Sequence, residues 1–276
     1  MYSRPDLHMH SVYSDGSDTP LQVLQKAREN RLDIFSLTDH DSFGGCKEIR
    51  EALRPGAPAF VNGIEFSCKD DLGKYHILGY RFQEEGSSVE RAAIMTHAER
   101  IEKAIRRFAY IEEKTGVPFT EEEKSRILAE NNPGRPHFAR LMLEKKLAPD
   151  FESAFQLVSG LGGNSFYLTP QEAIRYILES GGIPVLAHGL LGDGSQRLDW
   201  REMEDRILRL KKDGLQGMEC YYPTFSDEEE NRLLYLAGLY DLAVTAGSDY
   251  HGAGRSPLGS TNDPQPEVME RFYRML

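Results

Sequence analysis

The chain has 276 residues, enough for one large α/β domain or for a domain with a sizeable insertion. Its 44 aspartates and glutamates outnumber its 33 lysines and arginines, which gives a formal net charge of −11. A generally acidic surface repels nucleic-acid backbones. The composition therefore argues against long duplex DNA as a partner, and an anionic substrate is expected at a local positive site such as a bound metal.

The apolar stretches and the cysteines indicate the compartment. The longest apolar runs, such as IPVLA before His188, are far too short to cross a bilayer, and no apolar leader opens the chain. Three cysteines without a CxxC spacing do not suggest a disulfide framework. We expect a cytoplasmic protein without a membrane partner, and the oligomeric state stays open.

The first segment with a chemical signal is DLHMHS. In a β-strand, residues two apart point to the same face, so His8 and His10 would project together. Two such imidazoles can chelate a metal, although the same spacing also occurs on the wet faces of ordinary edge strands. A Gly/Asp turn follows. TPLQVLQKARENR then predicts a helix from about Pro20, with Thr19 as its N-cap.

Buried strands that end in polar residues then alternate with helices. Helical patterns cover residues 42–53, 170–180, 201–213 and 226–240 and separate most of the strands. This alternation predicts an α/β fold with a largely parallel sheet. The predicted strands are DIFSLTDHD, PAFVNGIEFS, KYHILGY, GGIPVLAHG, LQGMECYY and DLAVTAGSDYHG.

Between residues 83 and 168 the alternation stops. VERAAIMTHAERIEKAIRRFAYIEEKTG has the length and charge pattern of a solvated amphipathic helix, and further helical segments follow to about residue 158. We expect a main domain formed by residues 1–82 and 169–276, with 83–168 as a helical insertion. Within the insertion, SGLGGN (159–164) is interpreted as a flexible connection and His97 as a solvated side chain.

Six of the eight histidines lie at or just beyond the carboxyl ends of predicted strands, or inside a short one, together with three carboxylates. In parallel α/β folds these strand ends open onto one face, where functional groups collect. A lone histidine after a strand can simply cap a helix, but one metal cluster accounts for all of the positions together. So many donors suit two or three ions with a bridging carboxylate. The predicted ligands are His8, His10, Asp15, His40, Glu65, His76, His188, Asp249 and His251.

Six segments, in order, resemble the motifs of the PHP (polymerase and histidinol phosphatase) metal-dependent phosphoesterases: DLHMHSVYSDGS, SLTDHDSFGG, GIEFS, HILGY, AHG and GSDYHG. The resemblance covers residues 1–82 and 170–260. It is strongest to small stand-alone bacterial members that hydrolyse nucleoside 3′,5′-bisphosphates or trim short RNAs from the 5′ end. It implies a distorted (β/α)7 barrel with a helical insertion that forms part of the substrate cleft.

The resemblance also implies a site for three divalent transition metal ions. Carried over residue by residue, His8, His10, Glu65 and Asp249 hold one ion, Glu65 bridges to a second held by His76 and His188, and Asp15, His40 and His251 hold the third. Two positions depart from the family pattern. Gly189 follows His188 where the family usually has proline, and Phe225 stands where many members carry histidine.

Phosphoester hydrolysis is the chemistry that these groups support. A metal-bridged water with its pKa lowered towards about 7 supplies hydroxide for in-line attack on phosphorus, while two ions bind the phosphoryl oxygens. The third ion, or a nearby histidine or aspartate, assists the departing alkoxide. Imidazole and carboxylate ligands without thiolate fit manganese, iron or zinc, with manganese favoured. The predicted catalytic residues are Asp15, His40, Glu65 and His251.

NPGRPHFARLML is the candidate substrate contact outside the metal set. Arg135 and His137 lie in a Pro/Gly-rich turn that leads into a helix, where an arginine fork can grip a second phosphate. The pattern alone favours a surface arginine and an ordinary helix-terminal histidine. Similarity to the substrate-binding RPHFA segment of the family reverses that preference.

The leading hypothesis is an enzyme that hydrolyses phosphate esters of nucleotides or of short RNA. Two alternatives stay open: a phosphatase of a small non-nucleotide metabolite such as histidinol phosphate, and a non-catalytic, metal-bound regulatory module. The choice between mononucleotide and oligonucleotide substrates also stays open.

Overall fold

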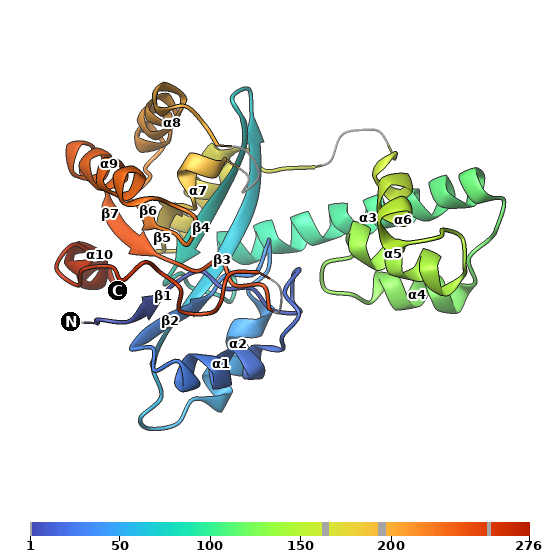
Figure 1. The fold of residues 1–276 in the computed structure, drawn as a ribbon, viewed down its shortest axis with the longest axis horizontal. Helices are drawn as coiled ribbons and strands as arrows, with labels where there is room; N and C mark the ends of the chain where they lie inside the picture. Colours follow the sequence, from blue (N-terminus) through green and yellow to red (C-terminus); the bar gives the residue numbers. More distant parts are fainter. Residues whose placement is uncertain (1, 162–165, 193–196, 253–254) are drawn as a thin grey trace. The chain divides into compact units, whose positions relative to one another are not determined.

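The computed structural model describes residues 2–161, 166–192, 197–252 and 255–276 (Figure 1). The chain forms two compact units, which are taken separately below: Met1–Ala93 with Tyr167–Leu276, and Ile94–Phe166. The sequence-based boundary of the insertion is residue 83, whereas Val89 and Ala92 are buried in the core of the first unit. Part of the predicted SGLGGN connection, residues 162–164, lies outside the described residues.

A seven-stranded sheet forms the first unit, and its strands neighbour one another in chain order. Neighbouring strands are parallel except around β4, which is antiparallel to both β3 and β5. The strands are β1 (Pro5–Asp6), β2 (Ile34–Leu37), β3 (Ala59–Asp70), β4 (Gly73–Tyr80), β5 (Ile183–Leu186), β6 (Gly217–Tyr221) and β7 (Ala243–Ala246).

The two edges of the sheet meet. The amide of Leu7 donates to the carbonyl of Ala246 at 3.0 Å, and Met9 forms a parallel bridge with Tyr250. These contacts join the segment of β1 to that of β7, so the sheet closes into a nearly complete barrel. The predicted distorted α/β barrel is confirmed.

Helices connect the strands of the barrel: α1 (Pro20–Glu29), α2 (Gly44–Ala52), α7 (Pro170–Glu179), α8 (Trp200–Lys212), α9 (Asp227–Leu239) and, near the C-terminus, α10 (Glu270–Met275). Thr19 caps α1 as predicted, because its side chain accepts from the amide of Gln22 while the Gln22 side chain accepts from the amide of Thr19. The predicted helices at 42–53, 170–180, 201–213 and 226–240 are confirmed, with ends that differ slightly.

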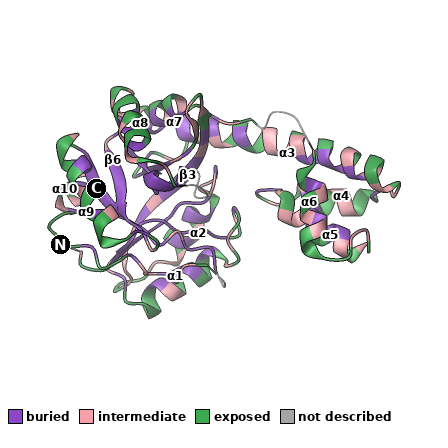
Figure 2. Cartoon of the chain, turned by 45° about the horizontal axis from the view of Figure 1, so that its top comes forward, coloured by how far each residue is buried: buried purple, intermediate pink, exposed green. Residues whose placement is uncertain are grey.

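Most of the strands are buried on both faces, as is expected when helices cover a sheet. Every residue of β2, β5, β6 and β7 is buried, and the helices turn exposed faces to solvent (Figure 2). Apolar side chains such as Ile64, Ile77 and Val185 belong to one continuous core. This core fixes the strands, and with them the positions of the polar residues where the strands end.

The second unit is helical. α3 (Ser88–Thr115) continues into it from the first unit and is followed by α4 (Glu121–Leu128), α5 (Arg135–Glu144) and α6 (Phe151–Ser159). Its core is built around Phe138, whose ring centroid lies 4.7 Å from that of Phe108. None of the described helices combines the length and the apolar character that crossing a bilayer requires.

Candidate metal centre

The candidate site lies at one end of the barrel, where the segments that leave the parallel strands converge. The assigned strand β1 ends at Asp6, and the segment after it is held by a hydrogen bond from the amide of His10 to the carbonyl of Tyr250, at 2.8 Å. β4 runs in the opposite direction, so its amino-terminal half reaches the same end of the barrel. The predicted ligands are His8 and His10 after β1, Asp15 in the next turn, His40 after β2, Glu65 in β3, His76 in β4, His188 after β5, and Asp249 and His251 after β7.

Glu65 is the centre of this cluster. Its side chain is fully buried, and both carboxylate oxygens face imidazole nitrogens. Oε2 lies 3.3 Å from Nε2 of His8, 3.2 Å from Nε2 of His10 and 3.0 Å from Nδ1 of His40; Oε1 lies 2.9 Å from Nδ1 of His76 and 3.3 Å from Nε2 of His188. One carboxylate thus joins side chains from four different segments, as a bridging ligand does.

Asp249 faces the same two histidines from the other side. Its Oδ1 lies 3.4 Å from Nε2 of His8 and 3.1 Å from Nε2 of His10. Its Oδ2 accepts a hydrogen bond from the hydroxyl of Tyr222 at 2.8 Å. Tyr222 therefore fixes the orientation of this carboxylate.

Asp15 marks the open side of the cluster. Its side chain is 39% exposed, and its Oδ1 lies 3.3 Å from Nε2 of His251 and 3.9 Å from Nε2 of His40. The ring of His251 stacks on that of His10, with centroids 4.1 Å apart. Asp15 is thus the most exposed of the predicted ligands.

The donor atoms fit divalent metal ions. Buried nitrogens and oxygens here have no hydrogen-bond partner: Nε2 of His8 and of His10, Nδ1 of His40 and both oxygens of Glu65. Buried polar atoms without partners are rare, and converging imidazole and carboxylate donors suit a bound cation. The donor atoms form three groups, and within each group they all lie within 4.8 Å of one another. The groups are His8, His10, Glu65 and Asp249; His10, Asp15, His40 and His251; and His40, Glu65 and His76.

Glu219 is part of the site, and the sequence reasoning missed it. This fully buried residue of β6 lies with its carboxylate 3.2 Å from Nδ1 of His8, and it accepts a hydrogen bond from the amide of His188 at 2.8 Å. It therefore holds the ring nitrogen of His8 that points away from Glu65. The signal was a carboxylate inside the apolar strand LQGMECYY, where a charge needs a buried partner.

The two departures from the family pattern have a packing role. Gly189 begins a short 3-10 turn, and a Cβ there would lie 2.6 Å from the Met203 side chain. Phe225 is buried against Tyr222, with ring centroids 5.1 Å apart. It thus supports the tyrosine that orients Asp249.

The carboxylates also set the protonation of the histidines in the metal-free chain. Burial alone would lower the pKa of His8, but the charges of Glu65 and Glu219 outweigh it and raise this pKa well above its ordinary value. For His10, burial is likewise outweighed, here by the nearby carboxylates of Asp249 and Glu65, and the pKa rises to about 10. Both imidazoles are therefore protonated at neutral pH, and a binding metal must displace their protons.

Metal affinity is accordingly expected to rise with pH between about 6 and 8, by about tenfold per pH unit for each proton displaced. Calorimetric titration of the metal-free protein with Mn²⁺, in two buffers of different ionisation enthalpy, measures the released protons. A pH-independent affinity without proton release would contradict the protonated state of His8 and His10.

Arg135 and His137, the predicted substrate contacts, lie in the second unit at the start of α5. Arg135 is exposed, and its guanidinium carbon lies 4.8 Å from the ring centroid of Phe155. Nδ1 of His137 accepts a hydrogen bond from the amide of Gly134 at 3.1 Å. His137 therefore caps its own helix, which leaves Arg135 as the residue better placed to reach a ligand.

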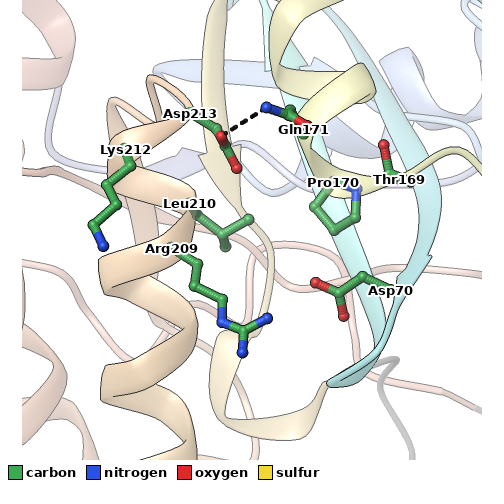
Figure 3. Close-up of a pocket in the computed structure, with 8 residues that line it drawn as sticks. All are labelled: Asp70, Thr169, Pro170, Gln171, Arg209, Leu210, Lys212 and Asp213. Atoms are coloured by element: carbon green, nitrogen blue, oxygen red, sulfur yellow. Dashed lines mark hydrogen bonds between the residues drawn. The ribbon is translucent and has the colours of Figure 1, made fainter.

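The first unit also has a surface pocket. It has a volume of about 330 Å³ and is formed by the end of β3, the start of α7 and the end of α8 (Figure 3). In this pocket the Gln171 side chain donates to Asp213 at 3.2 Å, and Thr169 caps α7. Its lining includes none of the predicted site residues, so the pocket is not the metal centre.

Comparison with known proteins identifies the family. The model of the PHP domain matches residues 6–212. The chain belongs to the PHP domain family. The predicted resemblance is confirmed. The predicted ligands from His8 to His188 lie within the matched residues, and Asp249 and His251 lie further along the chain, after β7.

Three curated relatives of this PHP-domain protein are similar over most of their length. A 3′,5′-nucleoside bisphosphate phosphatase from Chromobacterium violaceum is 30% identical over 98% of this chain and 95% of its own. A phosphoribosyl 1,2-cyclic phosphate 1,2-diphosphodiesterase from Eggerthella lenta is 30% identical over 91% and 96%. A 5′-3′ exoribonuclease from Haemophilus influenzae is 26% identical over 91% of each chain.

Solved structures agree with the PHP assignment. A Chromobacterium violaceum amidohydrolase with bound sulfate matches with a TM-score of 0.79 at 27% identity, over 99% of this chain and 95% of that one. A Bifidobacterium adolescentis protein matches with a TM-score of 0.78 at 27% identity, over 98% and 96%. The similarity therefore extends over both units.

Proposed function

We propose that this PHP-domain protein removes phosphate from nucleotides such as nucleoside 3′,5′-bisphosphates, or acts at the 5′ end of short RNA. It is a metal-dependent phosphoesterase, and thus an enzyme rather than a non-catalytic module. The observation that carries the proposal is the unbroken set of nitrogen and oxygen donors around Glu65. The full-length similarity to a bisphosphate phosphatase supports the choice of substrate.

The proposed site holds divalent metal ions in three positions. Three ions bind, with manganese favoured over iron or zinc. His8, His10, Glu65 and Asp249 hold the first, Glu65 with His76 and His188 the second, and Asp15, His40 and His251 the third. Three groups of donors within 4.8 Å of one another bear on this division. One group is the ligand set of the first ion, one contains the three ligands of the third ion together with His10, and one contains Glu65 and His76 together with His40. His188 belongs to none of these groups, but its Nε2 lies 3.3 Å from Oε1 of Glu65.

When bound, the ions lower the pKa of water and neutralise phosphoryl oxygens. The protein side chains do the positioning. Glu65 and Asp249 keep His8 and His10 turned into the site, and Glu219 fixes the back of His8. On the open side, Nε2 of His251 lies 3.3 Å from Asp15, a pair that can hold a proton and transfer it to the departing alkoxide oxygen.

A cytoplasmic location, with no long duplex DNA as a partner, is part of the proposal. Cys46, Cys68 and Cys220 are all free and buried, as is usual for proteins of reducing compartments. The net charge of −11 opposes binding to an extended polyanion.

A second candidate function is hydrolysis of a cyclic phosphate diester. The Eggerthella lenta diphosphodiesterase, with the same 30% identity as the bisphosphate phosphatase, favours it. The same cluster of donors would serve either reaction, because both break a phosphorus–oxygen bond with water.

A phosphate-release screen with Mn²⁺ tests the proposal. The panel comprises adenosine 3′,5′-bisphosphate, adenosine 5′-monophosphate, a 5′-phosphorylated short RNA, ribose 1,2-cyclic phosphate 5-phosphate and histidinol phosphate. We expect a kcat/KM of at least about 10⁴ M⁻¹s⁻¹ on a nucleotide or RNA substrate, and loss of activity with a chelator. A preference for histidinol phosphate, or full activity in the chelator, would refute it.

A further inference from the structure

Asp39, which follows β2, is a fully buried carboxylate outside the predicted ligand set. Its Oδ1 accepts hydrogen bonds from the amide of Ser11 and from the hydroxyl of Ser14, both at 2.7 Å. Its Oδ2 accepts from the hydroxyl of Ser11 at 2.7 Å, and its backbone carbonyl accepts from the amide of Glu65 at 3.1 Å. Asp39 therefore joins three segments that carry predicted metal ligands.

The hydroxyl of Ser14 links Asp39 to the ring of His10. Its Oγ lies 3.2 Å from Nδ1 of His10, and it also lies 3.4 Å from a carboxylate oxygen of Asp15. A serine hydroxyl has one proton to donate and two lone pairs that accept. The direction of the contact between Ser14 and His10 thus depends on where that proton goes.

The geometry at Asp39 fixes the direction. Its Oδ1 already accepts from the amide of Ser11, so this oxygen carries no proton of its own. At 2.7 Å from Oδ1, the oxygen of Ser14 must supply the proton, because otherwise two sets of lone pairs would face each other. Ser14 is left with lone pairs only, and these can accept from Nδ1 of His10.

The consequence for His10 is a defined arrangement of its ring. Nδ1 carries a hydrogen and donates it to Ser14, and Nε2 is the nitrogen whose lone pair a metal ion can use. Nε2 lies 3.2 Å from Oε2 of Glu65 and 3.1 Å from Oδ1 of Asp249, in the group of donors proposed for the first ion. The opposite tautomer would turn an N–H group towards that ion.

We propose that Asp39 and Ser14 are positioning residues of the metal centre: Asp39 takes the proton of the Ser14 hydroxyl, and Ser14 thereby fixes the tautomer and orientation of His10. The inference rests on the proposed function, because it assumes that His10 holds an ion, and it adds two residues that hold none themselves. Glu219 contacts the ring of His8 directly, whereas a hydroxyl stands between Asp39 and His10.

Calorimetric titration with Mn²⁺ tests the role of Ser14. Ser14→Ala removes the acceptor of Nδ1–H and is expected to weaken metal binding by about 10- to 100-fold. Ser36→Ala is the matched control. Ser36 is also fully buried, but its hydroxyl has no hydrogen-bond partner among the described residues, so metal affinity should not change. Wild-type affinity in Ser14→Ala would overturn the proposal.

A double variant tests whether Asp39 acts through Ser14. Asp39→Asn keeps the shape of the side chain and an oxygen for the amide of Ser11, but it is a weaker acceptor, and a loss of about 10-fold in Mn²⁺ affinity is expected. Added to Ser14→Ala, the same substitution should lower the affinity by less than about twofold further. Losses that multiply in the double variant would contradict the link.

Nuclear magnetic resonance of protein labelled with ¹⁵N-histidine and loaded with diamagnetic Zn²⁺ reads the tautomer in the wild type. We expect a proton on Nδ1 of His10 and none on Nε2, with the proton signal shifted upfield in Ser14→Ala because its acceptor is gone. A role of Ser14 in the fold alone would lower the Tm and leave this signal in place. A proton on Nε2, or an unchanged signal in Ser14→Ala, would refute the proposal.

Failure of the proposed function gives a different result. If the wild type binds no divalent metal, the metal centre itself is wrong. The Nδ1 proton of His10 in the metal-free protein, compared between the wild type and Ser14→Ala, then still decides whether Ser14 accepts from the ring.

Discussion

Glu65→Gln is expected to lower kcat/KM by about 1000-fold or more and to remove more than one metal ion from the protein. The carboxylate is fully buried and faces five imidazole nitrogens of the predicted ligand set. An amide of the same shape keeps the packing but offers a neutral oxygen and an NH₂ group that repels a cation. Loss of metal-based charge stabilisation amounts to several kcal/mol in the transition state, which is about three orders of magnitude in rate.

Elemental analysis after expression with added manganese measures the metal content, and phosphate release measures the rate. The matched control is His97→Ala, because His97 is an exposed histidine outside the predicted ligand set whose Nδ1 lies 3.0 Å from the backbone carbonyl oxygen of Asn131. The control should keep both its metal and its activity. A wild type with less than one transition metal per chain, or a Glu65→Gln protein with a full complement, would rule out a bridging role.

Glu219→Gln is expected to weaken metal binding by about 10- to 100-fold without unfolding the barrel. Glu219 faces Nδ1 of His8, whereas Glu65 faces Nε2 of the same ring. It holds His8 through Nδ1 and accepts from the backbone of His188, and it is therefore a positioning residue. The amide can still accept the backbone hydrogen bond, but it loses the charge that favours the correct orientation of the His8 ring.

Rescue by metal distinguishes positioning from a purely structural role. Raising the Mn²⁺ concentration should restore most of the kcat of Glu219→Gln, because only metal occupancy is impaired. Glu230→Gln is the matched control: Glu230 is also buried, but its partner is Asn262 at 2.6 Å, and its substitution should not change metal affinity. Wild-type metal affinity in Glu219→Gln would refute the positioning role, and activity lost beyond rescue would assign Glu219 to the fold.

The fold could be predicted closely from local patterns. Buried apolar runs alternating with amphipathic stretches gave the strands and helices of the barrel, and Thr19 before Pro20 marked the start of α1 because a hydroxyl there satisfies free amides. The antiparallel orientation of β4 could not be predicted from the sequence. The alternation of apolar and polar residues that predicts a strand does not depend on the direction of the strand. Only the pairing with β3 and β5 shows that β4 is antiparallel to its neighbours.

The sequence by itself determined which side chains are candidates for chemistry, because histidines and carboxylates at strand ends depart visibly from the apolar pattern around them. Only the tertiary structure decided how these side chains contact one another: Glu65 lies between five histidines, and Glu219 supports His8 from β6. The reason is physical. Periodicity and turn chemistry act between neighbours along the chain, whereas these contacts join residues that are distant in sequence and meet only when the core closes.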